Sequence, residues 1–275
     1  MAVYNLNGDI IGIGSAPEEK NLNYDANVIS INHRGYSTDA PENTIPAYIL
    51  SKKKGFNFVE TDVSFTSDGV PVLLHDSTID RTSNGSGNIN NLTYDQVRTY
   101  DFGSWKSASY TGTKIPSLAE FLQLCKSIML HPYIELKSNG SYTKEQVQQI
   151  VDMVRAYGLR GKVTYISFSS TFLGYVKDYD SEARLGFLKS SYASSDITTC
   201  KSLKTTKNIV FYDVAHGAIT QSVCDSFMAE DIPIEAWTVN SADTMLGLNK
   251  YVSGITSDNL IAGKVLYNNA MLQSN

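Results

Sequence analysis

From residue 28 onward, short apolar runs rich in β-branched residues alternate with longer stretches that have the spacing of amphipathic helices. A strand, a helix and another strand in succession favour parallel pairing, and eight such units favour closure of the sheet on itself. The sequence therefore predicts an α/β fold, a (β/α)8 TIM barrel. The eight predicted strands are residues 28–32, 56–63, 132–137, 162–168, 183–188, 208–213, 232–239 and 252–258.

An open, doubly wound parallel sheet is the alternative to a closed barrel. Such a sheet places a glycine-rich phosphate-binding loop after its first strand. Here the first predicted strand is followed by His33, Arg34 and Gly35, which fit neither a GxGxxG motif nor a P-loop. The length of 275 residues also suits a single barrel.

The alternation is interrupted after the second predicted strand. Residues 68–76 have the pattern of a returning strand, and residues 81–91 are rich in Gly, Asn and Ser, which is typical of an ordered loop. The regular pattern then resumes with a predicted helix near residues 117–130. Further helices are predicted near residues 44–54 and 144–157.

Residues 1–27 stand apart from this pattern and are assigned to an N-terminal hairpin and linker, which leaves residues 28–275 for the barrel. Residues 3–13 alternate apolar and polar side chains around Asn7 and Gly8, which favours a small hairpin. The polar, turn-rich stretch that follows is typical of a linker. We expect the hairpin either to cap the floor of the barrel or to act as a tether or dimerisation element.

The overall composition excludes some classes of function. The net charge of -5 lacks the basic footprint of nucleic-acid-binding proteins. No apolar run is long enough to span a membrane, and the N-terminus lacks the pattern of a secretory signal, so we expect a cytoplasmic protein if Met1 is native. The widely spaced Cys125, Cys200 and Cys224 are expected to be buried thiols rather than zinc ligands or disulfides.

Acidic side chains gather where the second and third predicted strands end, which is the end of a (β/α)8 barrel that carries active sites. Glu60 and Asp62 are two residues apart on one strand, as are Glu135 and Lys137 on the next, so each pair shares a face. Three crowded carboxylates repel one another, and oxygen ligands favour Mg²⁺ or Ca²⁺. The sequence therefore predicts a divalent-cation site at Glu60, Asp62 and Glu135. The alternative is that these carboxylates pair with Arg34 or Lys137.

Two histidines and two cations lie near the same predicted strand ends. His33 ends the first strand, and His75 follows an apolar run. Histidine exchanges protons near neutral pH, so this pair could supply a base and an acid on either side of a phosphodiester. Arg34 and Lys137 supply the positive charge that an anionic substrate needs.

Several segments of the chain closely resemble the glycerophosphodiester phosphodiesterase family. The resemblance covers roughly residues 28–265 and carries several motifs in one order, which makes it far more specific than a single short pattern. It implies a (β/α)8 barrel with a small insertion, at residues 64–115, after the second strand. The motifs are HRGYSTDAPENT (33–44), VETDVSFTSDGVPVLLHD (59–76), RTSNGSG (81–87), YIELK (133–137), AWTVN (236–240) and GITSD (254–258).

The resemblance also implies a role for each residue of the site. The matching positions are Glu60, Asp62 and Glu135 for the metal ligands, His33 and His75 for the general acid/base pair, Arg34 and Lys137 for the phosphate contacts, Trp237 for the substrate mouth, and Glu42 with Asn43 for the loop that braces the first active-site turn. The implied reaction is metal-dependent hydrolysis of a small-molecule glycerophosphodiester to glycerol 3-phosphate and an alcohol. The nucleophile is water or the substrate's own neighbouring hydroxyl, which would first give a cyclic phosphate.

Two alternatives to this function are retained. The same site could cleave a glycerol-phosphate polymer such as a teichoic acid, or a lysophospholipid, in a groove lined by Tyr36, Tyr110, Tyr192 and Tyr212. Alternatively, the chain could be a binding or structural module of a larger assembly, either tethered through its N-terminal hairpin or forming a homo-oligomer.

Overall fold

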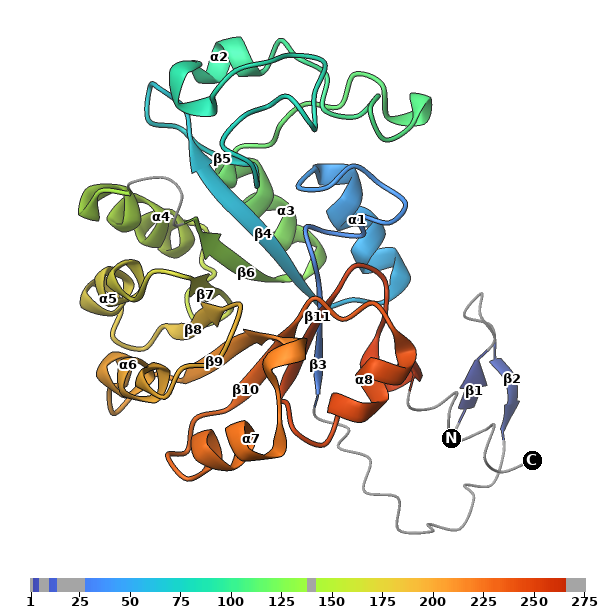
Figure 1. Cartoon of the computed structure of the whole chain (residues 1–275). Coiled ribbons are helices and arrows are strands. Elements are labelled where there is room, and N and C mark those ends of the chain that lie inside the picture. The colour runs from blue at the N-terminus through green and yellow to red at the C-terminus, as the bar shows by residue number, and fades with distance from the viewer. Residues whose placement is uncertain (1, 5–9, 14–27, 138–141, 266–275) are drawn as a thin grey trace.

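A computed structural model describes residues 2–4, 10–13, 28–137 and 142–265 of the chain. At its centre, eight parallel strands form a closed barrel (Figure 1). The first of them, β3, pairs with β4 on one side and with β11 on the other, which closes the sheet. The predicted (β/α)8 barrel is therefore confirmed. The barrel strands are β3 (Ile29–Asn32), β4 (Phe58–Phe65), β6 (His131–Leu136), β7 (Thr164–Ser167), β8 (Arg184–Lys189), β9 (Val210–Ala215), β10 (Ile234–Trp237) and β11 (Gly254–Ser257).

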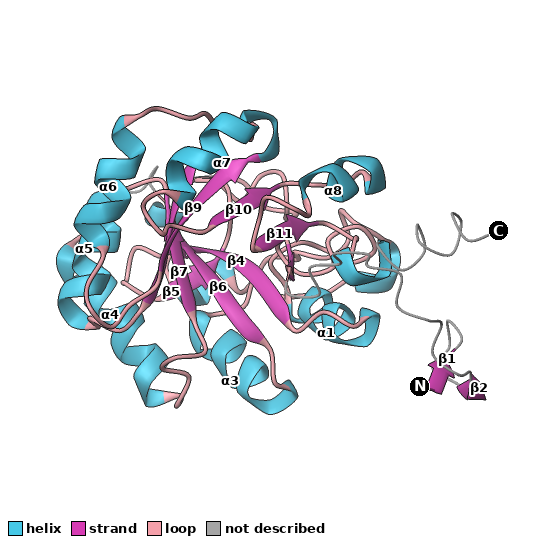
Figure 2. Ribbon diagram, turned by 90° about the horizontal axis from the view of Figure 1, so that it is seen from below, coloured by secondary structure: helices cyan, strands magenta, loops and turns pink. Residues whose placement is uncertain are grey.

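Helices connect consecutive barrel strands and form the outer ring that Figure 2 shows. Several begin at the capping signals that their sequences carry. At the start of α3, Ser117 and Glu120 form a capping box, and Thr143 and Gln146 do the same for α4. The ring consists of α1 (Ile45–Lys54), α3 (Leu118–Ile128), α4 (Lys144–Ala156), α5 (Ser170–Tyr179), α6 (Ser195–Leu203), α7 (Gln221–Met228) and α8 (Ala242–Leu248).

The insertion after the second barrel strand extends the C-terminal end of β4. Here β4 continues through Phe65, so the insertion begins at residue 66, slightly later than the predicted 64. The predicted returning strand is the short β5 (Pro71–Leu73), which pairs antiparallel with the end of β4. The rest comprises η1 (Ile89–Asn91), α2 (Tyr94–Val97) and η2 (Ala108–Tyr110) around a small apolar core of its own. Figure 1 shows this unit beyond the tip of β4, where it flanks the C-terminal end of the barrel.

The barrel interior is filled by side chains that point inward from alternate strand positions, including Ile31, Tyr133 and Phe211. Gly186 leaves room for the Phe211 ring, because a Cβ at that position would overlap it. A larger apolar core fills the space between the barrel and its helices. The interior is thus a packed core that opens into a cavity at the C-terminal end of the strands.

Outside the barrel, β1 (Ala2–Tyr4) and β2 (Ile10–Ile13) pair antiparallel, as expected for the N-terminal hairpin. The predicted linker at residues 14–27 lies outside the described residues. Within the described residues, no helix is long and apolar enough to cross a membrane. Cys125, Cys200 and Cys224 are buried free thiols, as predicted.

Candidate active site

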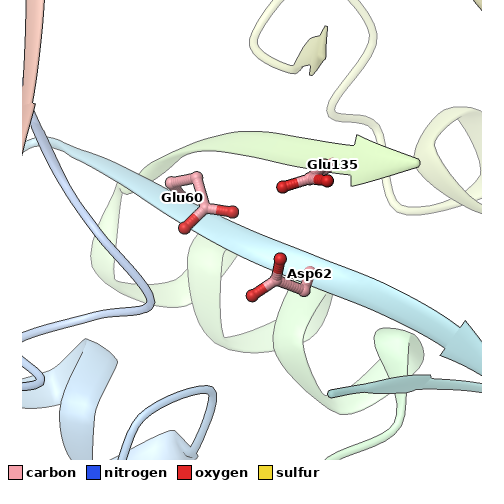
Figure 3. Close-up of side chains that lie close together, drawn as sticks. All are labelled: Glu60, Asp62 and Glu135. Atoms are coloured by element: carbon pink, nitrogen blue, oxygen red, sulfur yellow. The ribbon is translucent and has the colours of Figure 1, made fainter. Parts of the chain in front are cut away.

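Three carboxylates converge at the C-terminal ends of two neighbouring strands, as Figure 3 shows. Glu60 and Asp62 lie two residues apart on β4 and share its inward face. Asp62 is in direct register with Glu135 on β6. One oxygen atom from each of the three carboxylates lies within 4.8 Å of the others, and all three side chains are buried. The structure thus brings together the three acidic residues predicted from the sequence.

Burial and mutual repulsion disfavour the charged forms of two of these groups. Burial, followed by repulsion from Asp62 and Glu135, raises the pKa of Glu60 well above its ordinary value. Burial and Asp62 raise the pKa of Glu135 to about 7. Burial alone would also raise the pKa of Asp62, but Arg34 and Lys137 lower it below its ordinary value. Because Glu60 Oε1 is also buried without a hydrogen-bond partner in the described part of the chain, the cluster suits a hard divalent cation.

Arg34 occupies a tight turn directly after β3. Its backbone is in the left-handed region with φ 54°, and Gly35 follows with φ 76°, where a side chain would collide with α1. This turn directs the Arg34 backbone N–H to Glu60 Oε2 at 2.9 Å. The guanidinium donates from Nη1 to Glu42 Oε1 at 2.8 Å, and its Nε lies 3.3 Å from Asp62 Oδ2. The predicted alternative of ion pairing with Arg34 is therefore realised at Asp62.

Asn43 fixes the position of Asp62 through a hydrogen bond. Its Nδ2 donates to Asp62 Oδ2 at 2.8 Å, while its Oδ1 accepts hydrogen bonds from the hydroxyls of Tyr48 and Thr61, both at 3.0 Å. Asn43 also has a left-handed backbone with φ 54°, a conformation that Asn tolerates better than most residues. This network keeps the acidic cluster in place without adding charge to it.

Lys137 follows directly on β6 and lies beside the carboxylates. Its Nζ is 2.9 Å from Glu135 Oε1 and 3.3 Å from Asp62 Oδ1. Burial alone would lower the pKa of Lys137, but these two carboxylates raise it, so the ammonium stays charged. A fixed cation therefore stands at the edge of the acidic cluster.

His33 is oriented by a carboxylate from the last barrel strand. Its Nδ1 lies 2.8 Å from Asp258 Oδ1. Asp258 is held in turn by Asn240, whose Nδ2 donates to Asp258 Oδ2 at 2.6 Å and whose Oδ1 accepts from the Asp258 backbone N–H at 2.9 Å. Because Nδ1 faces the carboxylate, Nε2 of His33 is left for a substrate.

His75 is oriented in the same manner by the next residue in the chain. Its Nδ1 lies 2.7 Å from Asp76 Oδ1, and Arg81 Nε donates to Asp76 Oδ2 at 2.6 Å. Arg81 also donates from Nη1 and Nη2 to Glu42, at 2.7 and 2.9 Å. Since Glu42 also binds Arg34, it joins the turn after β3 to the insertion that carries His75.

These groups surround a cavity of about 240 Å³ at the C-terminal end of the barrel. One side is charged and the other is apolar and aromatic. Trp237, at the end of β10, packs edge-to-face against Phe168 with ring centroids 5.7 Å apart. The charged side consists of His33, Arg34, Glu60, His75, Glu135 and Lys137, and the apolar side of Ile166, Phe168, Leu188 and Trp237.

The predicted tyrosine groove differs from this cavity, because none of its four tyrosines is among the lining residues. The prediction is wrong most clearly for Tyr212, which is fully buried on the outer face of β9. There it stacks on Phe227, with centroids 4.3 Å apart, and donates a hydrogen bond to Asp196 at 2.9 Å. Strand alternation explains the error, since Phe211 and Asp213 take the inward positions on either side.

Three residues of the site were given no role in the sequence analysis. Asp258 and Arg81 hold the two histidines, and Asp213 lines the cavity from β9. The position of Asp258 at the end of the last predicted strand was a usable signal, because a closed barrel places that strand next to the first. Arg81 opens the RTSNGSG motif (81–87), which was a second usable signal, whereas Asp213 lies in none of the motifs.

Comparisons with known proteins point in one direction. The family model described as the glycerophosphoryl diester phosphodiesterase family matches residues 33–262. The Bacillus subtilis protein YhdW is 31% identical over 232 residues, which cover 83% of this chain and 93% of that protein. A glycerophosphodiester phosphodiesterase of Caldanaerobacter subterraneus is 32% identical over 158 residues, which cover 58% of this chain and 65% of that enzyme.

Among solved structures, a phosphodiesterase from Oleispira antarctica superposes with a TM-score of 0.78 and 27% sequence identity. The match covers 84% of this chain and 93% of that one. That structure contains the product sn-glycerol 3-phosphate. A glycerophosphodiester phosphodiesterase from Agrobacterium tumefaciens, at 24% identity and a TM-score of 0.71, shares the fold.

Proposed function

This chain belongs to the glycerophosphoryl diester phosphodiesterase family and is a phosphodiesterase acting on glycerophosphodiesters, and from that premise we propose a metal-dependent mechanism with two histidines. In this proposal it hydrolyses a glycerophosphodiester to sn-glycerol 3-phosphate and an alcohol. The observation that carries the proposal is the grouping of two carboxylate-oriented histidines, three carboxylates and two cations around one cavity.

Glu60, Asp62 and Glu135 would hold the divalent cation, Mg²⁺ or Ca²⁺. Their donor set consists of oxygens alone, which such hard ions prefer over zinc. When bound, the ion would neutralise charge on the phosphate and lower the pKa of a coordinated hydroxyl. Arg34 and Lys137 line the same cavity and would bind the remaining phosphate oxygens. Trp237 would cover the carbon skeleton of the substrate.

We assign His75 as the general base and His33 as the general acid. Burial, with Arg34 and Lys137 nearby, lowers the pKa of His75 despite the opposing effect of Asp62, so its neutral form is favoured. Asp76, the partner of His75, also binds Arg81. Asp258, the partner of His33, forms no ion pair with a Lys or Arg in the described part of the chain. Asp258 is therefore better placed to balance an imidazolium at His33.

The proton balance follows from these positions. His75 removes a proton from the nucleophile, which is water or the substrate's neighbouring hydroxyl, as the P–O bond to it forms. The bond from phosphorus to the alcohol oxygen breaks, and His33 delivers its proton to that oxygen. When a substrate hydroxyl is the nucleophile, the first step gives a cyclic phosphate. Water then opens this cyclic phosphate in a second step that uses the same two histidines.

The test is release of sn-glycerol 3-phosphate from glycerophosphocholine by the purified chain, with Mg²⁺ or Ca²⁺ and with excess EDTA. We expect release with one or both ions and its loss with the chelator. Equal release in EDTA would contradict the metal-dependent mechanism, and no release under any condition would contradict the substrate class.

A second pocket favours a longer substrate as the other candidate. It has a volume of about 220 Å³ and lies between the insertion and the barrel, and Lys137 lines both it and the main cavity. Its wall carries hydroxyl and amide side chains such as Ser67, Asn90 and Gln146, which suit a polyol unit. A glycerol-phosphate polymer would then be cleaved faster than glycerophosphocholine at equal concentration of phosphodiester bonds. Equal or slower cleavage would exclude this candidate.

A further inference from the structure

One buried carboxyl in the cavity has no part in the mechanism described above. Asp213 lies on the inward face of β9, in register with Leu188 on β8 and Glu235 on β10. Only 2% of its surface is exposed, and it nevertheless lines the cavity. Its Oδ1 has no hydrogen-bond partner in the described part of the chain. An acid that is buried yet unpaired costs stability unless something else satisfies it.

The surrounding protein does not provide that partner. Arg184 acts on the pKa of Asp213, but its guanidinium is bound to Glu235 instead. Burial, followed by repulsion from Glu235 and Glu135, raises the pKa of Asp213 well above its ordinary value. Since the carboxyl faces the cavity in which the substrate is expected, a group of the substrate is the natural partner.

The position of Asp213 indicates which kind of group this is. In the closed barrel, β9 is four strands away from β4 in either direction, so Asp213 faces the acidic cluster across the cavity. Phe168, Leu188 and Trp237 form the apolar wall of the same cavity, and Trp237 Nε1 donates to the Asp213 backbone carbonyl at 3.2 Å. This half of the cavity fits a short carbon chain that ends in a hydroxyl. A hydroxyl can pair with the carboxyl in either protonation state, because it both donates and accepts.

We propose that Asp213 is a specificity-determining residue that hydrogen-bonds the terminal primary hydroxyl of the glycerol moiety. This inference rests on the proposed function, in which glycerol is the part that all substrates share. A site built to bind a hydroxyl discriminates against an analogue without it, because its own buried polar group is left unpaired. Lysophospholipids carry an acyl ester in place of that hydroxyl. The chain therefore selects deacylated glycerophosphodiesters over lysophospholipids.

The experiment compares kcat/KM for glycerophosphocholine with that for its analogue lacking the terminal hydroxyl, in which hydrogen replaces the group and adds no bulk. We expect the wild-type chain to prefer glycerophosphocholine by about 10- to 10²-fold. Asp213→Ala should reduce this preference to about 3-fold or less, because it lowers kcat/KM for glycerophosphocholine and not for the analogue. Asp213→Asn should keep most of the ratio, because the amide can still bond to a hydroxyl.

Glu235→Gln is the matched control. It changes a buried carboxyl at the same level on the adjacent strand, but Glu235 is not among the residues that line the cavity. We expect it to leave the substrate ratio unchanged. A soluble short-chain lysophosphatidylcholine serves as a third substrate and should be as poor as the deoxy analogue for the wild type.

A wild-type ratio near one would overturn the proposal, and this measurement does not depend on any variant folding. An Asp213→Ala enzyme that loses the same factor on both substrates would also overturn it, because that is the signature of a structural role. Turnover of both substrates at equal rates contradicts only the role of Asp213. A wild-type enzyme that turns over neither substrate contradicts the proposed function, and the inference with it.

Discussion

Two buried clusters of charge lie inside the same barrel. The upper cluster, at the C-terminal ends of the strands, consists of Arg34, Glu60, Asp62, Glu135 and Lys137. The lower cluster, nearer the strand starts, consists of Tyr133, Arg184 and Glu235. Both are built from inward-facing residues of parallel strands, and both contain acids that burial makes difficult to ionise.

The clusters differ in their balance of charge. In the lower one, Glu235 is bound to Arg184, and the Tyr133 hydroxyl lies 3.4 Å from Glu235. Gly254 makes room for Glu235, because a Cβ there would lie 2.7 Å from its carboxyl carbon. The upper cluster has three acids for two cations and opens to the cavity. We conclude that unbalanced charge beside a cavity, rather than buried charge as such, distinguishes a ligand site from a structural one.

The largest expected effect comes from removing one acid of the upper cluster. Glu60→Gln should lower activity by about 10³-fold, because a bound cation contributes several kcal/mol of charge stabilisation at the phosphate. Wild-type protein should show a rise in Tm with Mg²⁺ or Ca²⁺, and the variant should lose most of that rise. Thermal unfolding with and without the ion measures the rise in Tm, and turnover of the phosphodiester measures the activity.

Without added cation, Glu60→Gln should leave Tm at or above the wild-type value, because it removes repulsion within the cluster. A marked decrease in Tm would show that Glu60 supports the fold rather than a ligand. An unchanged response to the ion would contradict its role as a metal ligand.

The histidines provide the next largest effect. His33→Ala and His75→Ala should each lower kcat by about 10²-fold or more while the chain remains folded, because each removes one partner of the acid/base pair. Turnover is measured with saturating cation, and circular dichroism reports the fold. Near-wild-type turnover in both variants would disprove the assignment. His131→Ala is the control, since His131 lies at the start of β6, at the opposite end of the barrel.

The fold and the acidic cluster could be predicted because both follow from local periodicity. Alternating strands and helices predict the barrel, and the two-residue spacing of Glu60 and Asp62 predicts that they share a face. Which residues contact the histidines depends instead on how the barrel closes and how the insertion folds. Asp258 reaches His33 only because β11 pairs with β3, and Arg81 reaches Glu42 only because the insertion folds back over the turn after β3.

The lower cluster was not predicted at all. Arg184 lies near the start of β8 and Glu235 near the start of β10, with β9 between the two strands, and nothing in their local sequence marks them as partners. Their ion pair depends on side chains that cross the barrel interior, and periodicity does not specify which inward residues meet there.

Breaking the lower cluster should affect stability and not catalysis. Arg184→Met removes the guanidinium, which lies 4.8 Å from the centroid of the Phe211 ring, and leaves Glu235 buried without its cation. We expect a loss of about 3 kcal/mol in the free energy of unfolding, measured by urea denaturation, with kcat within about 2-fold of the wild type. The double variant Arg184→Met with Glu235→Gln should recover part of the loss. A large decrease in kcat in a folded Arg184→Met protein would contradict the structural role of this cluster.

The smallest expected effect is a change in the pH profile of the site. As the general base, His75 must be neutral, and its pKa is lowered from the ordinary value of 6.5. A base loses activity as pH falls through its pKa, so kcat/KM should hold down to pH 6.5 and decline only below it. Arg81→Gln would release Asp76 to bind His75 alone, which favours the imidazolium and should move this decline to higher pH. Arg98→Gln, which breaks the ion pair between Arg98 of the insertion and Glu120 of α3, should leave the profile unchanged. A decline centred above pH 6.5 in the wild type, or no movement in Arg81→Gln, would contradict the assignment of His75 as the base.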